Sequence, residues 1–258
     1  MSSIHEAFSS GCAFIPFITG GDPDLETTEH LLHTLQEAGA DLIEIGIPFS
    51  DPIAEGPVIE AADARALAAG FTVDALFEML ARARDGITVP ILLMTYYNPI
   101  FVYGPDRFCA ACAACGVDGL IVPDLPFEEC TELLEPCEAQ GLELISLIAP
   151  TSEERIEMIA QGASGFLYCV SSLGVTGQRH DLGSAARDMT ARVRRVSDIP
   201  CAVGFGIATP EQAREVASFA DGVIVGSAFV SIIAEQGRDC IPAISHYAQD
   251  IEQAISGR

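Results

Sequence analysis

Among the residues able to do acid–base chemistry, Glu44 has the most informative surroundings. It lies in the segment Leu42–Pro52, LIEIGIPFSDP, an apolar run with β-branched residues that ends in glycine and proline. Such a run predicts a buried strand. Burial raises the pKa of a carboxyl group that lacks partners, because desolvation disfavours its charged form. Glu44 is therefore a candidate general acid or base, and the alternative is a carboxylate held in a structural hydrogen-bond network.

Three glycine-rich segments late in the chain have the composition of an anion site. They are Gly174-Val175-Thr176-Gly177, Gly204-Phe205-Gly206 and Gly226-Ser227. Glycines let backbone N–H groups approach an anion closely, and a helix that begins near Ser227 favours negative charge at its N-terminus. Each motif alone is also typical of a turn. Taken together, and in a chain with no lysine, they predict a phosphorylated substrate held by backbone dipoles and hydroxyl groups.

Eight apolar runs that can position these residues alternate with amphipathic stretches of helical period. The expected strands are Cys12–Thr19, Ala40–Ile47, Val89–Thr95, Gly119–Val122, Leu142–Ile148, Gly165–Val170, Pro200–Gly204 and Gly222–Val225. Expected helices are Leu25–Ala38, Val73–Arg84, Asp106–Cys115, Phe127–Gln140, Ser152–Gln161, Ala185–Val196, Pro210–Phe219 and Cys240–Ile255, with a short amphipathic helix in Met1–Ser10. Near-continuously apolar strands followed by helices predict a parallel sheet that is buried on both faces.

Eight βα units in about 250 residues match a TIM (β/α)8 barrel, which would span residues 1–258 as a single domain. A doubly wound sheet is the competing fold, and the absence of a Gly-x-Gly-x-x-Gly motif after the first strand disfavours it. Two long connections, Pro48–Ile59 and Val170–Ala185, follow the second and sixth strands. Both lie where a barrel places its active site, so they are candidate lids. Asp22 and Asp124 end strands one and four, where they can cap a helix or touch a ligand.

The amino-acid composition argues against several classes of protein. The chain has 37 acidic and 13 basic residues and a net charge of −24, which argues against nucleic-acid binding because phosphate backbones need clustered cations. No apolar run reaches the length of a membrane span, and the N-terminus does not resemble a signal peptide. We therefore expect a cytoplasmic protein that does not bind membranes, and its nine cysteines are not expected to form a disulfide framework.

One cysteine cluster has a spacing that superficially resembles an iron–sulfur motif. It is Cys109-x-x-Cys112-x-x-Cys115, with alanines in the gaps and no fourth cysteine in the required pattern. On a helix these thiols form a row of small packing residues. No metal site is expected.

Several segments in register resemble the α subunit of tryptophan synthase over almost the full chain. They are Phe14–Pro23 (FIPFITGGDP), Leu42–Pro57, Met94–Ile100 (MTYYNPI), Gly116–Pro126 (GVDGLIVPDLP), Ala149–Thr151, Gly174–Gly177 and Val203–Ile207. The resemblance implies a TIM barrel that cleaves indole-3-glycerol phosphate to indole and glyceraldehyde 3-phosphate by a retro-aldol reaction, without a cofactor. It also implies an α2β2 assembly in which indole passes to a β subunit that carries PLP.

The resemblance further implies roles for individual residues. Glu44 would be the acid and base, Glu55 the carboxylate that meets the indole N–H, and Tyr168 a neighbour of the glycerol hydroxyl. The resemblance also implies a phosphate site, an indole pocket, a closing loop and a surface for the β subunit. The phosphate would be held by Gly177, Gly206, Gly226 and Ser227, and the indole ring would be enclosed by Phe17, Ile121 and Phe205. Thr176 would assist loop closure, and Pro48–Pro57 would contact the β subunit.

Two residues depart from the family pattern. Glu55 stands where the family has aspartate, so the carboxylate is displaced by about one carbon–carbon bond, and a misplacement near 1 Å can cost on the order of a hundredfold in rate. Ser172 stands where arginine is frequent. The sequence thus leaves three possibilities open: a tryptophan-pathway lyase, a stand-alone lyase that releases free indole, and a weakened module that activates a β subunit.

Overall fold

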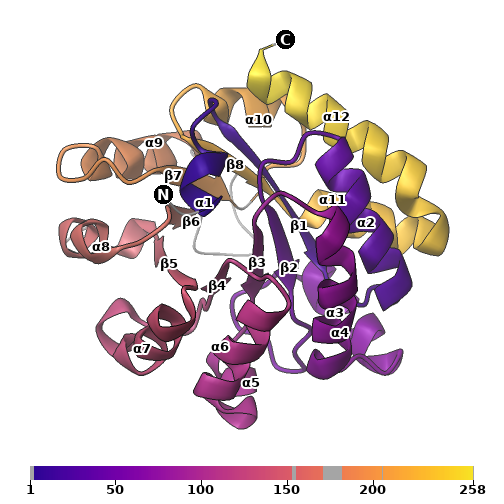
Figure 1. The fold of residues 1–258 in the computed structure, drawn as a ribbon. Coiled ribbons are helices and arrows are strands. Elements are labelled where there is room, and N and C mark those ends of the chain that lie inside the picture. The colour runs from indigo at the N-terminus through magenta and orange to yellow at the C-terminus, as the bar shows by residue number, and fades with distance from the viewer. Residues whose placement is uncertain (1–2, 153–154, 171–181, 205, 258) are drawn as a thin grey trace.

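A computed structural model describes residues 3–152, 155–170, 182–204 and 206–257. Eight parallel strands close into one barrel in sequence order, and helices surround it (Figure 1). The strands are β1 (Ala13–Thr19), β2 (Ile43–Gly46), β3 (Ile91–Met94), β4 (Gly119–Ile121), β5 (Glu143–Ile148), β6 (Leu167–Val170), β7 (Cys201–Gly204) and β8 (Gly222–Val225). The predicted TIM barrel is confirmed, and all eight strands lie within the ranges expected from the sequence.

The helices follow the expected alternation with two additions. They are α1 (Ser3–Ala7), α2 (Leu25–Glu37), α3 (Pro57–Ala68), α4 (Val73–Ala83), α5 (Tyr97–Tyr103), α6 (Pro105–Ala114), α7 (Thr131–Gln140), α8 (Ile156–Gly162), α9 (Leu182–Val193), α10 (Pro210–Ala217), α11 (Ser227–Gln236) and α12 (Ile241–Ser256). The expected helix Phe127–Gln140 is divided, because a 3-10 turn at Phe127–Glu129 precedes α7. The expected helix Ser152–Gln161 begins later, at Ile156.

Helices α3 and α5 were missed by the sequence interpretation, and the second-strand connection is correspondingly shorter than Pro48–Ile59. It ends at Gly56, because Pro57 occupies the first helical turn of α3, where its fixed φ and missing N–H are tolerated. At the start of α5, the Tyr97 N–H donates to Asp124 Oδ1 at 2.9 Å. That cap comes from a segment remote in sequence, so local patterns around Tyr97 do not show it.

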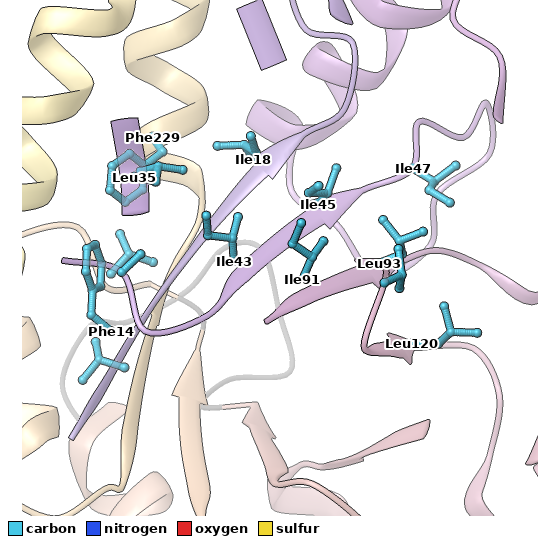
Figure 2. Close-up of a cluster of buried hydrophobic side chains, with 14 of the residues drawn as sticks. Phe14, Ile18, Leu35, Ile43, Ile45, Ile47, Ile91, Leu93, Leu120 and Phe229 are labelled. Carbon is cyan, nitrogen blue, oxygen red and sulfur yellow. The ribbon is translucent and has the colours of Figure 1, made fainter. Parts of the chain in front are cut away.

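Two hydrophobic clusters hold the barrel together. The larger lies between the strands and the helices, and Figure 2 shows part of it, with Ile43, Ile45 and Leu93 among its labelled side chains. The smaller includes alternate strand residues such as Ile15, Phe17 and Leu92 and fills the barrel interior. Burial on both faces explains why the strands are near-continuously apolar.

Helix α1 closes the N-terminal end of the barrel. Ile4 is fully buried in the interior cluster, and the Phe8 and Phe166 rings lie 5.3 Å apart just before β6 begins. The amphipathic helix expected near the N-terminus is therefore confirmed. Because α1 covers this end, we expect a functional site at the C-terminal ends of the strands, as in other barrels.

Cys109, Cys112 and Cys115 are buried in or at the end of α6, as expected for packing residues. All nine cysteines are free thiols. Within residues 3–257, apart from the gaps given above, no helix is long and apolar enough to span a membrane, and no group of three or more potential ligands could hold a metal ion.

Candidate active site

Glu44 is a fully buried carboxyl on the inner face of the barrel. On β2 it lies in register with Phe17 of β1 and Leu92 of β3, both members of the interior cluster. Its side chain is 0% exposed, and within the described part of the chain neither carboxylate oxygen has a hydrogen-bond partner. Burial raises the pKa of Glu44 to about 8. The group is therefore mostly protonated at neutral pH and can donate a proton to a bound ligand.

Tyr168 faces the same interior from β6. It is buried in the cluster that contains Phe17 and Ile121. Burial raises the pKa of Tyr168 well above its usual value, and the nearby charge of Glu44 raises it further. The tyrosine therefore keeps its proton, and its hydroxyl remains a neutral group close to the Glu44 carboxyl.

Glycines on neighbouring strands make room for these interior side chains. A Cβ on Gly204 of β7 would lie 2.6 Å from Tyr168 Oη, and a Cβ on Gly46 of β2 would lie 2.6 Å from Phe17 Cζ. Real Cβ atoms do not approach so closely. Tyr168 and Phe17 therefore owe their positions near Glu44 to glycines at the C-terminal ends of β7 and β2.

The loop between β2 and α3 carries the second candidate acid, Glu55. Tyr96 holds this loop, because its buried hydroxyl accepts hydrogen bonds from the N–H groups of Ile53 at 3.1 Å and Ala54 at 2.9 Å. The Phe49 and Tyr96 rings lie 5.3 Å apart. These contacts hold the loop at Phe49 and at Ile53 and Ala54, immediately before Glu55.

Glu55 is joined to a buried residue that the sequence interpretation missed, Asp63 of α3. Burial, followed by the charge of Asp63 and a hydrogen bond with it, raises the pKa of Glu55 to about 8. Burial also raises the pKa of Asp63 to about 6. The only available sequence signal was an aspartate on the inner face of a helix starting at Pro57, and it required α3 to be recognised first.

A third acid, Asp22, lies near this pair and forms an ion pair with Arg65. Its carboxylate is 1% exposed and accepts from Arg65 Nε at 2.9 Å and Arg65 Nη2 at 2.7 Å. The two parallel bonds give a bidentate pair of the kind that fixes geometry as well as charge. This pair anchors α3 to the turn after β1.

The candidate phosphate site lies at the C-terminal ends of β7 and β8, which are neighbours in the barrel. Gly226 directly precedes α11, and Ser227 is its first residue, so the backbone N–H groups of the first turn have no intrahelical acceptor. Gly206 lies just beyond β7. Three further candidates, Gly177, Thr176 and Phe205, lie outside the described residues, as does the departure at Ser172.

Comparison with known proteins decides which family this barrel represents. A family model described as "Tryptophan synthase alpha chain" matches residues 6–256. The chain belongs to the tryptophan synthase alpha chain family. A relative from Trichormus variabilis with that name is 50% identical over 263 residues, covering 99% of each chain.

Solved structures of the tryptophan synthase alpha family agree over the whole barrel. The subunit alpha structure from Legionella pneumophila has a TM-score of 0.90 and 38% identity, with 100% of both chains covered. An α2β2 tryptophan synthase complex from Pyrococcus furiosus matches with a TM-score of 0.87 and 39% identity, over 93% of this chain and 97% of that one. The family resemblance and the fold inferred from sequence are both confirmed.

Proposed function

We propose that this chain is a carbon–carbon lyase of tryptophan biosynthesis, which cleaves indole-3-glycerol phosphate to indole and glyceraldehyde 3-phosphate. The observation that carries the proposal is Glu44, a fully buried carboxyl without hydrogen-bond partners among the described residues, inside a barrel of this family. Leaving such a group unpaired is costly. The cost is understood if a substrate supplies the missing partners.

In the proposed reaction Glu44 moves one proton in each direction. Its protonated carboxyl donates to the indole carbon that carries the glycerol chain, and the resulting carboxylate removes the proton of the adjacent glycerol hydroxyl. The carbon–carbon bond then breaks, its electron pair returning to the indole ring while the hydroxyl becomes the aldehyde. The proton count balances without a cofactor, and a pKa of about 8 for Glu44 suits a group that must both give and take a proton near neutral pH.

The other candidate residues position the substrate around Glu44. Glu55 accepts from the ring N–H, and the negative charge that it shares with Asp63 stabilises the positive charge that builds on the ring during protonation. Tyr168 lies near the glycerol hydroxyl. The indole ring is enclosed by Phe17, Ile121 and Phe205. Backbone N–H groups at Gly177, Gly206, Gly226 and Ser227 hold the phosphate, because a helix N-terminus and glycine turns favour an anion, and Thr176 assists closure over it.

The proposal includes a β subunit as partner, with PLP on that subunit and none on this chain. Solved relatives include an α2β2 complex. Three large apolar side chains are exposed in the segments that follow β2 and β3: Ile53 at 80%, Phe101 at 62% and Val102 at 77%. Ile53 belongs to the same loop as Glu55, so a partner that covers this surface also touches the loop that carries the second acid. The nine free cysteines fit a reducing cytoplasm.

The test is an assay of the purified chain with indole-3-glycerol phosphate, alone and with a β subunit. We expect indole and glyceraldehyde 3-phosphate in a one-to-one ratio, with a higher rate in the presence of the partner. Equal rates with and without the partner would favour a stand-alone lyase. No cleavage in either case, combined with stimulation of the β subunit, would favour the activating module and refute the lyase.

A further inference from the structure

We propose that Asp63 is a positioning residue for the lyase reaction, which holds Glu55 by a shared proton so that one Glu55 oxygen is presented to the ring N–H of the substrate. The inference rests on the proposed function, because it assigns Glu55 a substrate contact. It also explains how a chain with glutamate at this position can retain the geometry that the family reaches with aspartate.

Asp63 ties α3 to the loop that carries Glu55. Its side chain is only 3% exposed, and Asp63 Oδ2 accepts a long hydrogen bond from the Phe49 N–H at 3.5 Å, at the start of the loop. The same side chain hydrogen-bonds with Glu55, at the end of the loop. With Tyr96 holding Ile53 and Ala54, the loop is fixed at its beginning, its tip and its end.

A hydrogen bond between two carboxyl groups requires a proton. Two ionised carboxylates within hydrogen-bonding reach repel each other, so the pair keeps one proton over a range of pH. Burial and the mutual interaction place the pKa of Asp63 at about 6 and that of Glu55 at about 8. Near neutral pH the pair therefore carries one negative charge and shares one proton.

The further charged groups that act on the pair from the described part of the chain, Asp22 and Glu60, are both acidic. Asp22 raises the pKa of Asp63 through its charge, but Asp22 is itself bound in two places by Arg65. Glu60, exposed on the first turn of α3, raises the pKa values of both members by its charge. These neighbours favour the proton-sharing state, because each adds negative charge near a site that would otherwise lose its proton.

Glu55 also has acceptor capacity beyond its contact with Asp63. Its Oε2 atom is buried, and no N–H or O–H group of the described residues donates to it. A protonated carboxyl that donates to Asp63 still has acceptor capacity, and an unpaired buried acceptor is costly until a donor arrives. The ring N–H of the substrate is such a donor. The longer glutamate side chain therefore reaches Asp63 and still leaves an acceptor for the ring.

The first experiment measures protonation and does not depend on activity. The full chain is labelled with carbon-13 at glutamate side-chain carboxyls, and the Glu55 resonance is assigned by its loss in Glu55→Gln. We expect a midpoint near pH 8 in the wild type. In Asp63→Asn the amide keeps an acceptor for Phe49 N–H but can donate to Glu55, so the midpoint should fall by about one pH unit or more. The matched control is Glu60→Gln, an acid of the same helix, which should change the midpoint far less.

The second experiment measures indole formation. Asp63→Ala removes both contacts and should lower kcat about tenfold with KM within a few fold, while Asp63→Asn should restore most of the loss at pH 7. An unchanged Glu55 midpoint in Asp63→Asn overturns the shared proton, and an unchanged kcat in Asp63→Ala overturns the positioning role. If the wild type shows the expected midpoint but no cleavage, the proposed function fails while the carboxyl pair stands.

Discussion

Two acids, Glu44 inside the barrel on β2 and Glu55 in the following loop, both have a pKa of about 8, but for different reasons. Burial alone raises the pKa of Glu44. For Glu55, burial is the largest cause and the charge and hydrogen bond of Asp63 add to it. Glu44 is fixed by strand register between Phe17 and Leu92, whereas Glu55 is fixed by contacts that a loop makes with neighbouring side chains.

The two pKa values therefore differ in origin: the barrel interior as a whole raises that of Glu44, whereas one neighbouring side chain contributes to that of Glu55. The pKa of Glu44 depends on the whole interior, so no single neighbouring substitution should return it to its ordinary value. The pKa of Glu55 depends in part on one residue of α3, so it can be tuned. We expect the strand acid to determine whether the reaction occurs and the loop acid to determine how fast.

The largest expected effect is that of Glu44→Gln. The amide cannot carry the proton, so kcat for indole release should fall at least about a hundredfold while KM stays within a few fold. Steady-state assays with indole-3-glycerol phosphate measure both constants. Retention of more than roughly a tenth of wild-type turnover would remove Glu44 from this role.

A smaller effect is expected for Glu55→Asp, even though it restores the family residue. The shorter side chain withdraws from Asp63 in a loop that has adapted to glutamate, so we expect kcat to fall about tenfold with little change in KM. Comparison of kcat in the two proteins checks this. An increase of about tenfold, about 1.4 kcal/mol of barrier, would show that Glu55 acts from the wrong distance.

The two acids should also make the free energy of unfolding depend on pH. A carboxyl with a raised pKa in the folded state binds a proton that the unfolded chain has released, so stability falls as pH rises from about 4.5 to about 8. Glu44 alone contributes a slope of up to about 1.4 kcal/mol per pH unit in the free energy of unfolding. Urea unfolding should show a flatter slope in Glu44→Gln, and an equal slope in both proteins would contradict the burial of Glu44.

The smallest effect is expected at the proposed phosphate site, where backbone N–H groups are expected to bind the anion. Ser227→Ala removes a hydroxyl but keeps the N-terminus of α11, so KM should rise only a few fold and kcat should be nearly unchanged. A crystal soaked with glycerol phosphate should show the anion by Gly206, Gly226 and Ser227, together with Gly177. An anion bound elsewhere, with this corner empty, would refute the site.

The barrel and the strand acid could be predicted from sequence because both depend on local patterns. Apolar runs define the strands, and a glutamate inside one of them, Glu44, stands out without further information. Glycines at strand ends likewise indicated the candidate phosphate site around Gly226. These features follow from what burial on two faces requires of each strand.

The loop acid's surroundings could not be predicted, because they depend on contacts between segments that are distant in sequence. Asp63 is informative only once α3 packs its inner face against the loop, and Tyr96 is separated from Ile53 by 43 positions. The start of α5 is capped by Asp124, which comes from beyond β4. In each case a side chain from one segment satisfies the backbone or carboxyl of another, and composition and periodicity do not record such pairings.

The most direct test of the difference between the two acids is the pH dependence of kcat/KM for indole release, measured above pH 7 in the wild type and in Asp63→Asn. Protonated Glu44 starts the reaction, so the rate should fall as pH rises through about 8. Because burial alone sets that pKa, the fall should persist at the same pH in Asp63→Asn, where only Glu55 has changed its titration. A rate that stays flat up to pH 9, or a fall that moves with the Asp63 substitution, would contradict the account.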